Sequence, residues 1–420
     1  MRQKRRNDPN LDSGNCFDSI MKQRFTVSAS RELWEFVPLE RYVIPGDTQN
    51  WVRKKRRTLG RLFGPARTEA QSRVRTEKEL RALPAIRLEH WVPPIDWAPA
   101  ARALDRVIRH GDTGLRAVPA VCFLIGQPYC GHTEIVEHWA AGRNAVVIPA
   151  PSPDIILARD DRWFEKHRLD REPWAVPALE RWFLRHADGL AVVRRFLDQA
   201  LSGAWGEGMI GCDSWAWTYL QRVLAISGPP ALTLQAFDGY RLARYFFQLT
   251  RGSVQPRPRV CSATTGRSIL PDEETLAEDD FEASIELRQL AAHCRGNLGT
   301  AWKYWRTRLR TEGDAETSDE VASNDYVLWL ADDPTEPVLP AETGEEVLFV
   351  LHALLVHNGL PAERLSELLP MLRSQIVSNL LQLESLGLVE SCDGCWRVAA
   401  LGYAAVRDLL AEHQYLTDPF

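Results

Sequence analysis

Apolar runs alternate with helical stripes through the middle of the 420-residue chain. The segment from Val121 to Ala140 begins as an apolar strand, continues through a loop bracketed by glycines and ends in a helix start. A helix with apolar residues at helical spacing over Pro99–His110 leads into it. Asn144–Pro149 has the pattern of a second buried strand, and Gly208–Asp213 that of a short strand ending in a carboxylate. Strands that alternate with helices predict an α/β fold whose parallel sheet binds ligands at the carboxyl ends of its strands.

Three further segments extend this pattern. Pro177–Leu201 carries a helical-period apolar stripe and predicts one long amphipathic helix. Ala231–Gln235 and Arg259–Ala263 are short apolar runs that fit two more strands of the same sheet. We therefore expect one continuous sheet that includes both runs.

The last part of the chain predicts three helices, a hairpin and a fourth helix. Asp393-Gly394 is the pair favoured in a type I′ turn, so Cys392 and Cys395 should face each other across the hairpin. This order of elements is that of a winged helix-turn-helix. The predicted segments are Glu346–His357, Pro361–Leu369, Ser374–Leu386, the hairpin over 387–398, and Leu401–Ala411.

Composition is that of an ordinary globular protein, with 45% hydrophobic and 25% charged residues. No apolar run approaches the roughly 18 residues that span a membrane, and the N-terminus lacks a signal-peptide core. We therefore expect a cytoplasmic location, which the eight scattered cysteines also suit. The predicted division is a basic region of unassigned fold (1–85), an α/β domain (86–270), a helical lid (271–310), an acidic linker (311–345) and the winged helix (346–420).

The loop after the first strand has the spacing of a phosphate-binding loop. Gly126, Gly131 and Thr133 fit the pattern G-x-x-x-x-G-K-[ST], but His132 stands in the lysine position. Backbone N–H groups of such a loop hold phosphate oxygens whatever the side chains are, and Thr133 offers a hydroxyl to Mg²⁺. Without the lysine charge we expect weakened binding and poor or absent turnover. A plain strand-turn-helix corner is the alternative interpretation of the same residues.

Two polar positions after later strands extend this hypothesis. Asp213 would stand at the carboxyl edge of the sheet, where a Walker B carboxylate helps to hold Mg²⁺. Ser214 follows Asp213 at the position where proteins with a Walker B carboxylate usually carry the glutamate that orients the attacking water. In P-loop NTPases of the additional-strand class, a polar residue after a late strand contacts the γ-phosphate, which makes Thr264 or Thr265 a candidate sensor. Turn residues after short strands explain the same positions.

Together these features resemble the AAA+/STAND group of P-loop ATPases, notably origin-recognition-type initiators. The resemblance rests on the loop, on Asp213, on a Gly296-Asn297 turn within the helical stretch Phe281–Leu309, and on the winged helix that follows. It covers about residues 85–420. It implies ATP or ADP with Mg²⁺ bound between sheet and lid, and Arg295 is the nearest substitute for the lid arginine that senses nucleotide. The departures from the pattern imply a degenerate member. The nucleotide-binding set it implies is Gly126, Gly131, His132, Thr133, Thr264 and Arg295, with Thr133 and Asp213 on the metal.

Charge is unevenly distributed along the chain. Residues 1–100 hold 20 Lys or Arg against 12 Asp or Glu, with a basic run at Arg53–Arg57, whereas residues 341–420 hold 4 Arg against 11 acidic residues. The predicted recognition helix offers Arg373 as its one outward cation, which favours protein docking over DNA binding by the winged helix. The basic arm is a candidate contact for nucleic acid, anionic lipid or an acidic protein face, and a solvated arm is the alternative interpretation.

Two hypotheses follow. The first is a nucleotide-binding switch, either a weak ATPase or a pseudo-ATPase, whose winged helix docks a protein partner and to which we assign no catalytic residue. The alternative is a non-enzymatic winged-helix DNA-binding regulator or adaptor with a structural α/β domain.

Overall fold

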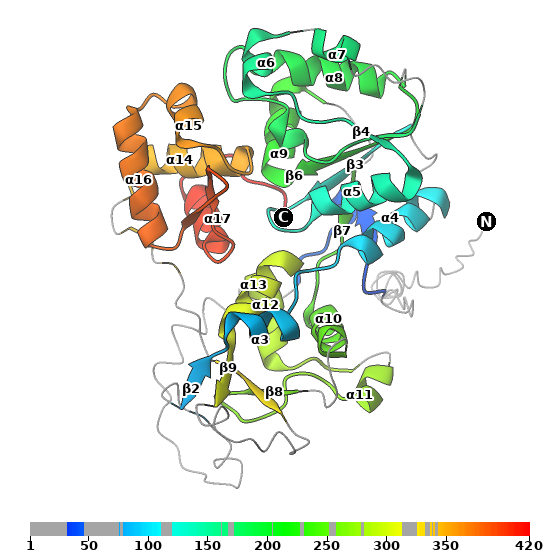
Figure 1. The fold of residues 1–420 in the computed structure, drawn as a ribbon, viewed down its shortest axis with the longest axis vertical. Helices are drawn as coiled ribbons and strands as arrows, with labels where there is room; N and C mark the ends of the chain where they lie inside the picture. Colours follow the sequence, from blue (N-terminus) through cyan, green and yellow to red (C-terminus); the bar gives the residue numbers. More distant parts are fainter. Residues whose placement is uncertain are drawn as a thin grey trace, which may run out of the picture. The chain divides into compact units, whose positions relative to one another are not determined.

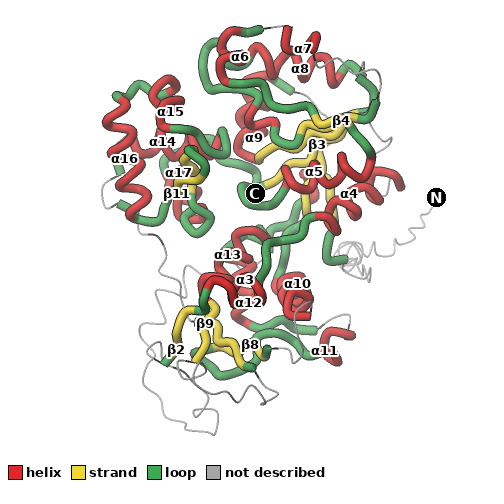
Figure 2. Tube along the Cα trace, viewed as in Figure 1, coloured by secondary structure: helices red, strands yellow, loops and turns green. Residues whose placement is uncertain are grey.

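The centre of the fold is a six-stranded, largely parallel sheet in the order β1-β7-β3-β6-β5-β4. In this computed structural model only β1 and β7 pair antiparallel, and the other neighbours run parallel (Figures 1 and 2). The mixed α/β class with a parallel central sheet is thereby confirmed. The strands are β1 (Phe36–Pro38), β3 (Val121–Gly126), β4 (Val146–Val147), β5 (Trp174–Val176), β6 (Gly208–Asp213) and β7 (Ala231–Leu234).

The structure describes most of the chain. The basic run Arg53–Arg57 lies outside the described residues. None of the helices in the described part combines the length and the apolar run that crossing a bilayer needs. The described residues are 32–45, 75, 79–110, 120–160, 162–166, 172–203, 205–226, 231–251, 258–278, 281–312, 326–331, 337, 339–340 and 343–420.

Helices cover both faces of the central sheet, and β3 shows why. Its successive side chains point to opposite faces. Phe123 belongs to the core shared with α8 and α9, whereas Leu124 belongs to the core shared with α4 and α5. A strand buried on both faces reads as a continuous apolar run, which is what the sequence has here. The helices of this domain are α4 (Ala98–His110), α5 (His132–Arg143), α6 (Pro153–Ala158), α7 (Arg162–Lys166), α8 (Ala191–Leu201) and α9 (Ser214–Leu224).

Two predictions about this sheet are wrong in detail. The strand within Asn144–Pro149 is present as β4, but it is the outermost strand and its valines are exposed instead of buried. Pro177–Leu201 is not one helix: it holds the 3₁₀ turn η3 (Leu179–Arg181), a loop and then α8. Just before it lies the unpredicted strand β5, which is buried along its whole length.

A second sheet has four strands in the order β2-β9-β10-β8. The expectation that Arg259–Ala263 joins the central sheet is therefore wrong, because β8 pairs with β10 instead. Within the predicted acidic linker, β10 forms where a short strand is expected over Tyr326–Leu330, and β9 includes residues 311 and 312. The bounds are β2 (Leu80–Ala82), β8 (Arg259–Ser262), β9 (Leu309–Glu312) and β10 (Val327–Leu330).

Helices between the two sheets include the two expected on either side of the Gly296-Asn297 turn. The turn at Gly296 and Asn297 separates α12 from α13, and both Arg295 and Gly296 have positive φ, 52° and 76°. A left-handed pair of residues reverses the chain after α12, and the Asn297 side chain then caps α13. The helices outside the sheet domain are α3 (Ala85–Trp91), α10 (Gly239–Arg251), α11 (Glu273–Ala277), α12 (Ile285–His293) and α13 (Leu298–Arg308).

Residues 343–420 contain three helices, a hairpin and a fourth helix in the predicted order. The hairpin is closed by Asp393 and Gly394, both at positive φ, and Cys392 is the register partner of Cys395, as the turn chemistry predicts. That this module is a winged helix in the functional sense stays a prediction. Its elements are α14 (Glu345–Val356), α15 (Ala362–Leu368), α16 (Arg373–Ser385), β11 (Val389–Cys392), β12 (Cys395–Val398) and α17 (Tyr403–Glu412).

Candidate functional site

The glycine-bracketed loop joins β3 to α5 at the centre of the sheet edge. A Cβ on Gly126 would collide with the Cys130 sulfur, and a Cβ on Gly131, which has a φ of +75°, would collide with the Trp97 ring. Both glycines are therefore required by close packing. Gly131 is the N-cap of α5 and offers no side chain to the first N–H groups of the helix. Those groups have no intrahelical acceptor, so they and the positive end of the helix dipole favour an anion at this place.

The His132 side chain points to Glu180 inside the protein. Its Nε2 lies 3.2 Å from Oε1 of Glu180, and the two side chains are 4% and 0% exposed. Burial lowers the pKa of His132, but the Glu180 carboxylate and the Cys130 thiol raise it more, so its pKa lies well above the ordinary value. Burial raises the pKa of Glu180, and the imidazole outweighs this and holds the pKa below its ordinary value. The residue in the lysine position is thus paired with a buried carboxylate, and its contact with phosphate stays a prediction.

Asp213 stands at the edge of the sheet where the sequence places it. It is the register partner of Gly126 at the carboxyl edge. Its Oδ1 accepts a hydrogen bond of 2.9 Å from the backbone N–H of Trp215 and so caps α9. Complete burial raises its pKa well above the ordinary value. Among the described residues no group of three or more His, Cys, Asp and Glu could hold a metal. Binding of Mg²⁺ by Thr133 and Asp213 stays a prediction.

Glu180 is the functional residue that the sequence analysis missed. It lies in η3, just after β5, the strand beyond β6, and its second oxygen accepts a hydrogen bond of 3.1 Å from the backbone N–H of Asp213. An acidic residue inside the apolar run from Trp174 to Phe183 was the available signal. A buried charge requires a partner, and Glu180 finds it in His132 at the start of α5.

The turn before α13 lies directly against the loop. The Asn297 amide donates to the backbone oxygen of Pro128 at 2.7 Å and to the side chain of Gln127 at 3.3 Å. A Cβ on Gly299 would collide with the backbone oxygen of Tyr129. The sheet domain and the helical hairpin thus share one polar interface at the loop, as the lid hypothesis requires.

The two expected sensor residues have different positions. Thr264 follows β8 in the second sheet and is exposed. It was expected at the loop because Arg259–Ala263 was expected to be a strand of the central sheet, and that reason no longer holds. Arg295 lies beside the loop, where its backbone oxygen accepts a hydrogen bond from the Tyr42 hydroxyl. Its guanidinium, however, donates to the backbone oxygen of Phe420 at 2.6 Å.

Residues 418–420 fill the space between loop, lid and C-terminal module. Asp418 is buried and accepts hydrogen bonds from Ser214, Tyr403 and Arg407. Phe420 is 2% exposed and contacts Tyr42 edge to face, with ring centroids 4.7 Å apart.

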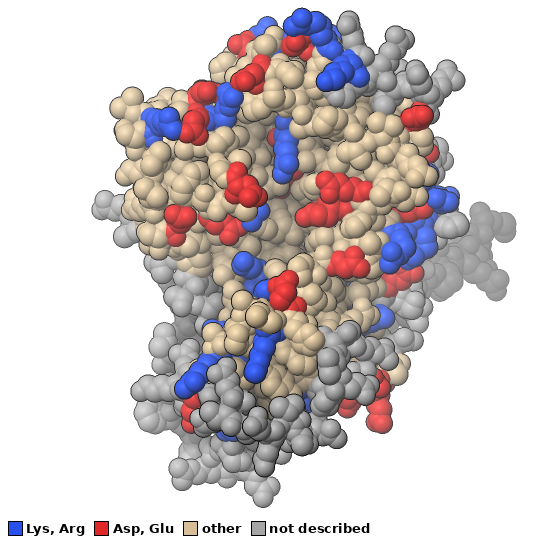
Figure 3. Space-filling view, viewed as in Figure 1, with Lys and Arg blue, Asp and Glu red and all other residues tan. Residues whose placement is uncertain are grey.

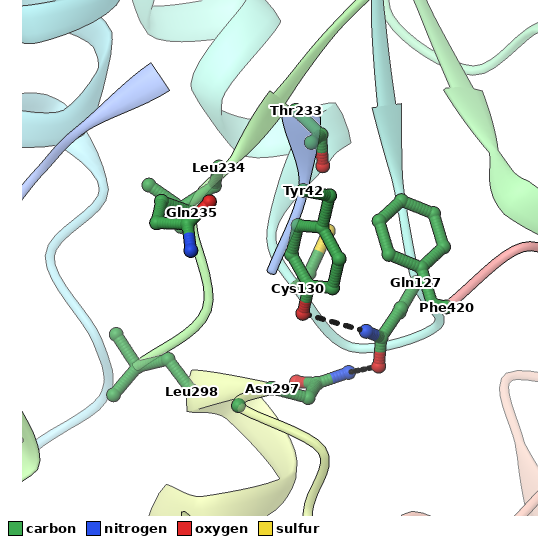
Figure 4. A pocket seen from close by; sticks show the side chains of 10 residues that line it. Tyr42, Gln127, Cys130, Thr233, Leu234, Gln235, Asn297, Leu298 and Phe420 are labelled. Atoms are coloured by element: carbon green, nitrogen blue, oxygen red, sulfur yellow. Dashed lines mark hydrogen bonds between the residues drawn. The ribbon is translucent and has the colours of Figure 1, made fainter. Parts of the chain in front are cut away.

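The space left beside these rings is small. Figure 4 shows the pocket, in which Tyr42, Gln127 and Asn297 form a hydrogen-bonded chain, with Cys130 and Phe420 alongside. The room for water-sized molecules is about 20 Å³. That is enough for water but not for a nucleotide base, so a nucleotide needs this segment to move.

The C-terminal module shows no basic surface for DNA. Arg373, the outward cation of α16, is paired with Glu363 of the same module. On the face drawn in Figure 3, basic and acidic side chains are interspersed among uncharged ones. Leu372 and Leu381 of α16 are exposed at 70% and 53%, which suits a protein contact better than a phosphate backbone.

Comparisons with known proteins add little to this picture. No family model matches the chain. No curated protein matches it either. Among solved structures it is similar to the crystal structure of Cdc6p from Pyrobaculum aerophilum, with 13% identity, coverage of 78% of this chain and 98% of that chain, and a TM-score of 0.31.

Proposed function

We propose that the protein is a nucleotide-binding switch of AAA+/STAND type that binds ATP or ADP without turning it over. The observation that carries the proposal is the loop between β3 and α5. Its two glycines are held by close packing, and the N-terminus of α5 is uncapped at the carboxyl edge of a parallel sheet. Backbone N–H groups in this arrangement bind phosphate without help from side chains.

The absence of turnover in this proposal follows from the polar groups around the loop. His132 is paired with Glu180 and supplies no mobile cation. Asp213 is buried and caps α9, so binding of Mg²⁺ through it has no support. Ser214, in the position expected for a water-orienting glutamate, donates its hydroxyl to Asp418 at 2.7 Å. We therefore propose nucleotide binding that needs no Mg²⁺.

In this proposal the switch is the exchange of a nucleotide for residues 418–420. Arg295 and Arg407 both donate to the backbone oxygen of Phe420, so departure of this segment frees two cations near the loop. The same segment holds α17 of the C-terminal module through Tyr403 and Arg407. A nucleotide that displaces it would loosen the module and free it to dock a protein partner.

The test is calorimetry with ATP and ADP, with and without Mg²⁺, on the full chain and on two variants. Gly131→Val should abolish binding, because the side chain enters the space of the Trp97 ring and strains the loop. Asp418→Asn should strengthen binding, since it weakens the competing segment. If the docked segment is favoured by about 2 kcal/mol, its loss raises apparent affinity roughly 30-fold.

Thr264→Ala is the matched control, because this threonine belongs to the second sheet and should leave affinity unchanged. Circular dichroism checks that each variant is folded. The proposal is abandoned if neither nucleotide binds the wild type or Asp418→Asn at saturating concentration.

A further inference from the structure

Cys130, His132 and Glu180 form a connected row of polar side chains at the loop. The Cys130 sulfur lies 3.9 Å from Nδ1 of His132, and the opposite nitrogen, Nε2, lies 3.2 Å from Glu180. Glu180 is fixed in turn by the backbone N–H of Asp213. When protonated, His132 held this way directs one N–H to the carboxylate and the other toward the sulfur. This is the order of groups that activates a cysteine nucleophile in proteins.

His132 faces the Cys130 sulfur from the first residue of α5, and Gly131, the N-cap of that helix, directly follows Cys130. The ionisable groups around this row include the Tyr42 hydroxyl, the Cys212 thiol and the Asp213 carboxyl, and burial raises the pKa of each.

Cys130 also differs from the other described cysteines in access. Cys122, Cys212, Cys261 and Cys294 are buried, whereas Cys392 and Cys395 are exposed on the hairpin. Cys130 is half-buried and lines the pocket between loop and lid. Because the free room there is about 20 Å³, only a molecule close to water in size reaches the sulfur without rearrangement.

We propose that Cys130 is a modification site that reacts with hydrogen peroxide, the small electrophile that this pocket admits. The thiolate sulfur attacks one peroxide oxygen, an S–O bond forms and the O–O bond breaks. The departing hydroxide takes a proton from the His132 imidazolium and leaves as water. Sulfur loses two electrons, peroxide gains them, and the products are cysteine sulfenic acid, water and a neutral imidazole.

Oxidation here has a mechanical consequence. The Cys130 sulfur already occupies the space next to the Gly126 Cα, where even a Cβ would not fit. An added oxygen must therefore displace the loop or fill its concave side. The inference does not rest on nucleotide binding, because reactivity of the thiol is measured without nucleotide.

The experiment uses the full chain with Cys16, Cys392 and Cys395 changed to serine, which leaves Cys130 as the half-buried thiol. The protein is exposed to hydrogen peroxide, and the reaction is quenched by unfolding in urea with dimedone, so that the trap need not enter the pocket. Peptide mass spectrometry then locates the adduct. We expect Cys130 to react about tenfold faster than a thiol in the urea-unfolded chain at pH 7, because His132 lies beside its sulfur and supplies a proton to the departing hydroxide.

Two variants separate activation from mere exposure. His132→Asn should slow oxidation of Cys130 about tenfold, to the rate of a thiol in the urea-unfolded chain. Glu207→Gln removes a partner of Arg143 at the far end of α5 and should leave this rate unchanged. Equal rates in the wild type and His132→Asn, with both folded by circular dichroism, would show that the histidine does not activate the thiol.

Discussion

Replacement of Glu180 by glutamine should loosen the loop region most strongly near pH 5.5. The change leaves His132 buried without its counter-charge, while the new amide keeps one oxygen for the Asp213 N–H or for the imidazole. Removing one partner of a buried ion pair costs about 3–5 kcal/mol. Because glutamine preserves one hydrogen bond, we expect the lower end of this range. The free energy needed to open β3 and α5 should fall by about 3 kcal/mol.

The pH dependence follows from the two pKa shifts. The pKa of His132 is raised from 6.5, so its contribution is complete below pH 6.5 and is lost as pH rises through the folded value. The pKa of Glu180 is lowered from 4.5, so its contribution is complete above pH 4.5 and is lost as pH falls through the folded value. The pair therefore stabilises most between these limits, and the cost of Glu180→Gln should shrink as the imidazole becomes neutral in the wild type.

Native-state hydrogen exchange of peptides from 121–143 measures this cost without assuming that the whole chain unfolds in one step. A loss of about 3 kcal/mol corresponds to exchange roughly a hundredfold faster. The matched control is Glu207→Gln, since Glu207 pairs with Arg143 at the surface and such pairs contribute about 0–1 kcal/mol. If Glu180→Gln and Glu207→Gln cost the same at pH 5.5, the reasoning about a buried ion pair is refuted.

Three further substitutions test the packing around the loop by the same exchange measurement. Gly299→Ala should lower the free energy needed to open the loop by about 1–3 kcal/mol, because its methyl group collides with the backbone oxygen of Tyr129. Unchanged protection of the loop against exchange would contradict this contact. Gly142→Ala should instead stabilise α5 by about 0.5–1 kcal/mol, since nothing lies within 4 Å of the added carbon and alanine favours the helix; faster exchange in α5 would count against that expectation. Asp418→Asn should speed exchange in α17 about tenfold, because it weakens the charged hydrogen bond from Arg407; equal exchange would show that Asp418 does not hold the module.

The elements that sequence patterns predicted well are those whose signal is local. The run Val121–Ile125 is buried on both faces, and the hairpin at Asp393-Gly394 needs two residues at positive φ, which this pair supplies. Strand β5 was missed because it has only three residues, and the apolar residues that follow, such as Trp182 and Phe183, happen to have helical spacing. They are buried from a 3₁₀ turn and a loop instead.

The remaining errors concern pairing between distant segments. The composition of β8 is that of a buried strand, and nothing in it tells whether β7 or β10 is near; pairing with β10 joins residues about 70 positions apart. The same limitation applies to the site. His132 was identified as the departure from the lysine pattern, but its partner Glu180 becomes visible only when η3 is placed beside the loop. Sequence thus located the loop and its odd residue, while the structure supplied the charge that explains it.

The positive groups around the loop are already engaged by the protein itself, and this shapes what a ligand can do. A nucleotide that takes the place of residues 418–420 exchanges the backbone oxygen of Phe420 for phosphate oxygens on Arg295, so the number of hydrogen bonds changes little. What is lost is the burial of the Phe420 ring, about 1.5–3 kcal/mol, together with the contacts of Asp418. By linkage, this free energy lowers the affinity for nucleotide, and nucleotide binding favours release of the C-terminal module by the same amount. The proposed switch therefore requires weak nucleotide binding. If displacement of residues 418–420 cost no free energy, nucleotide binding would not affect the C-terminal module.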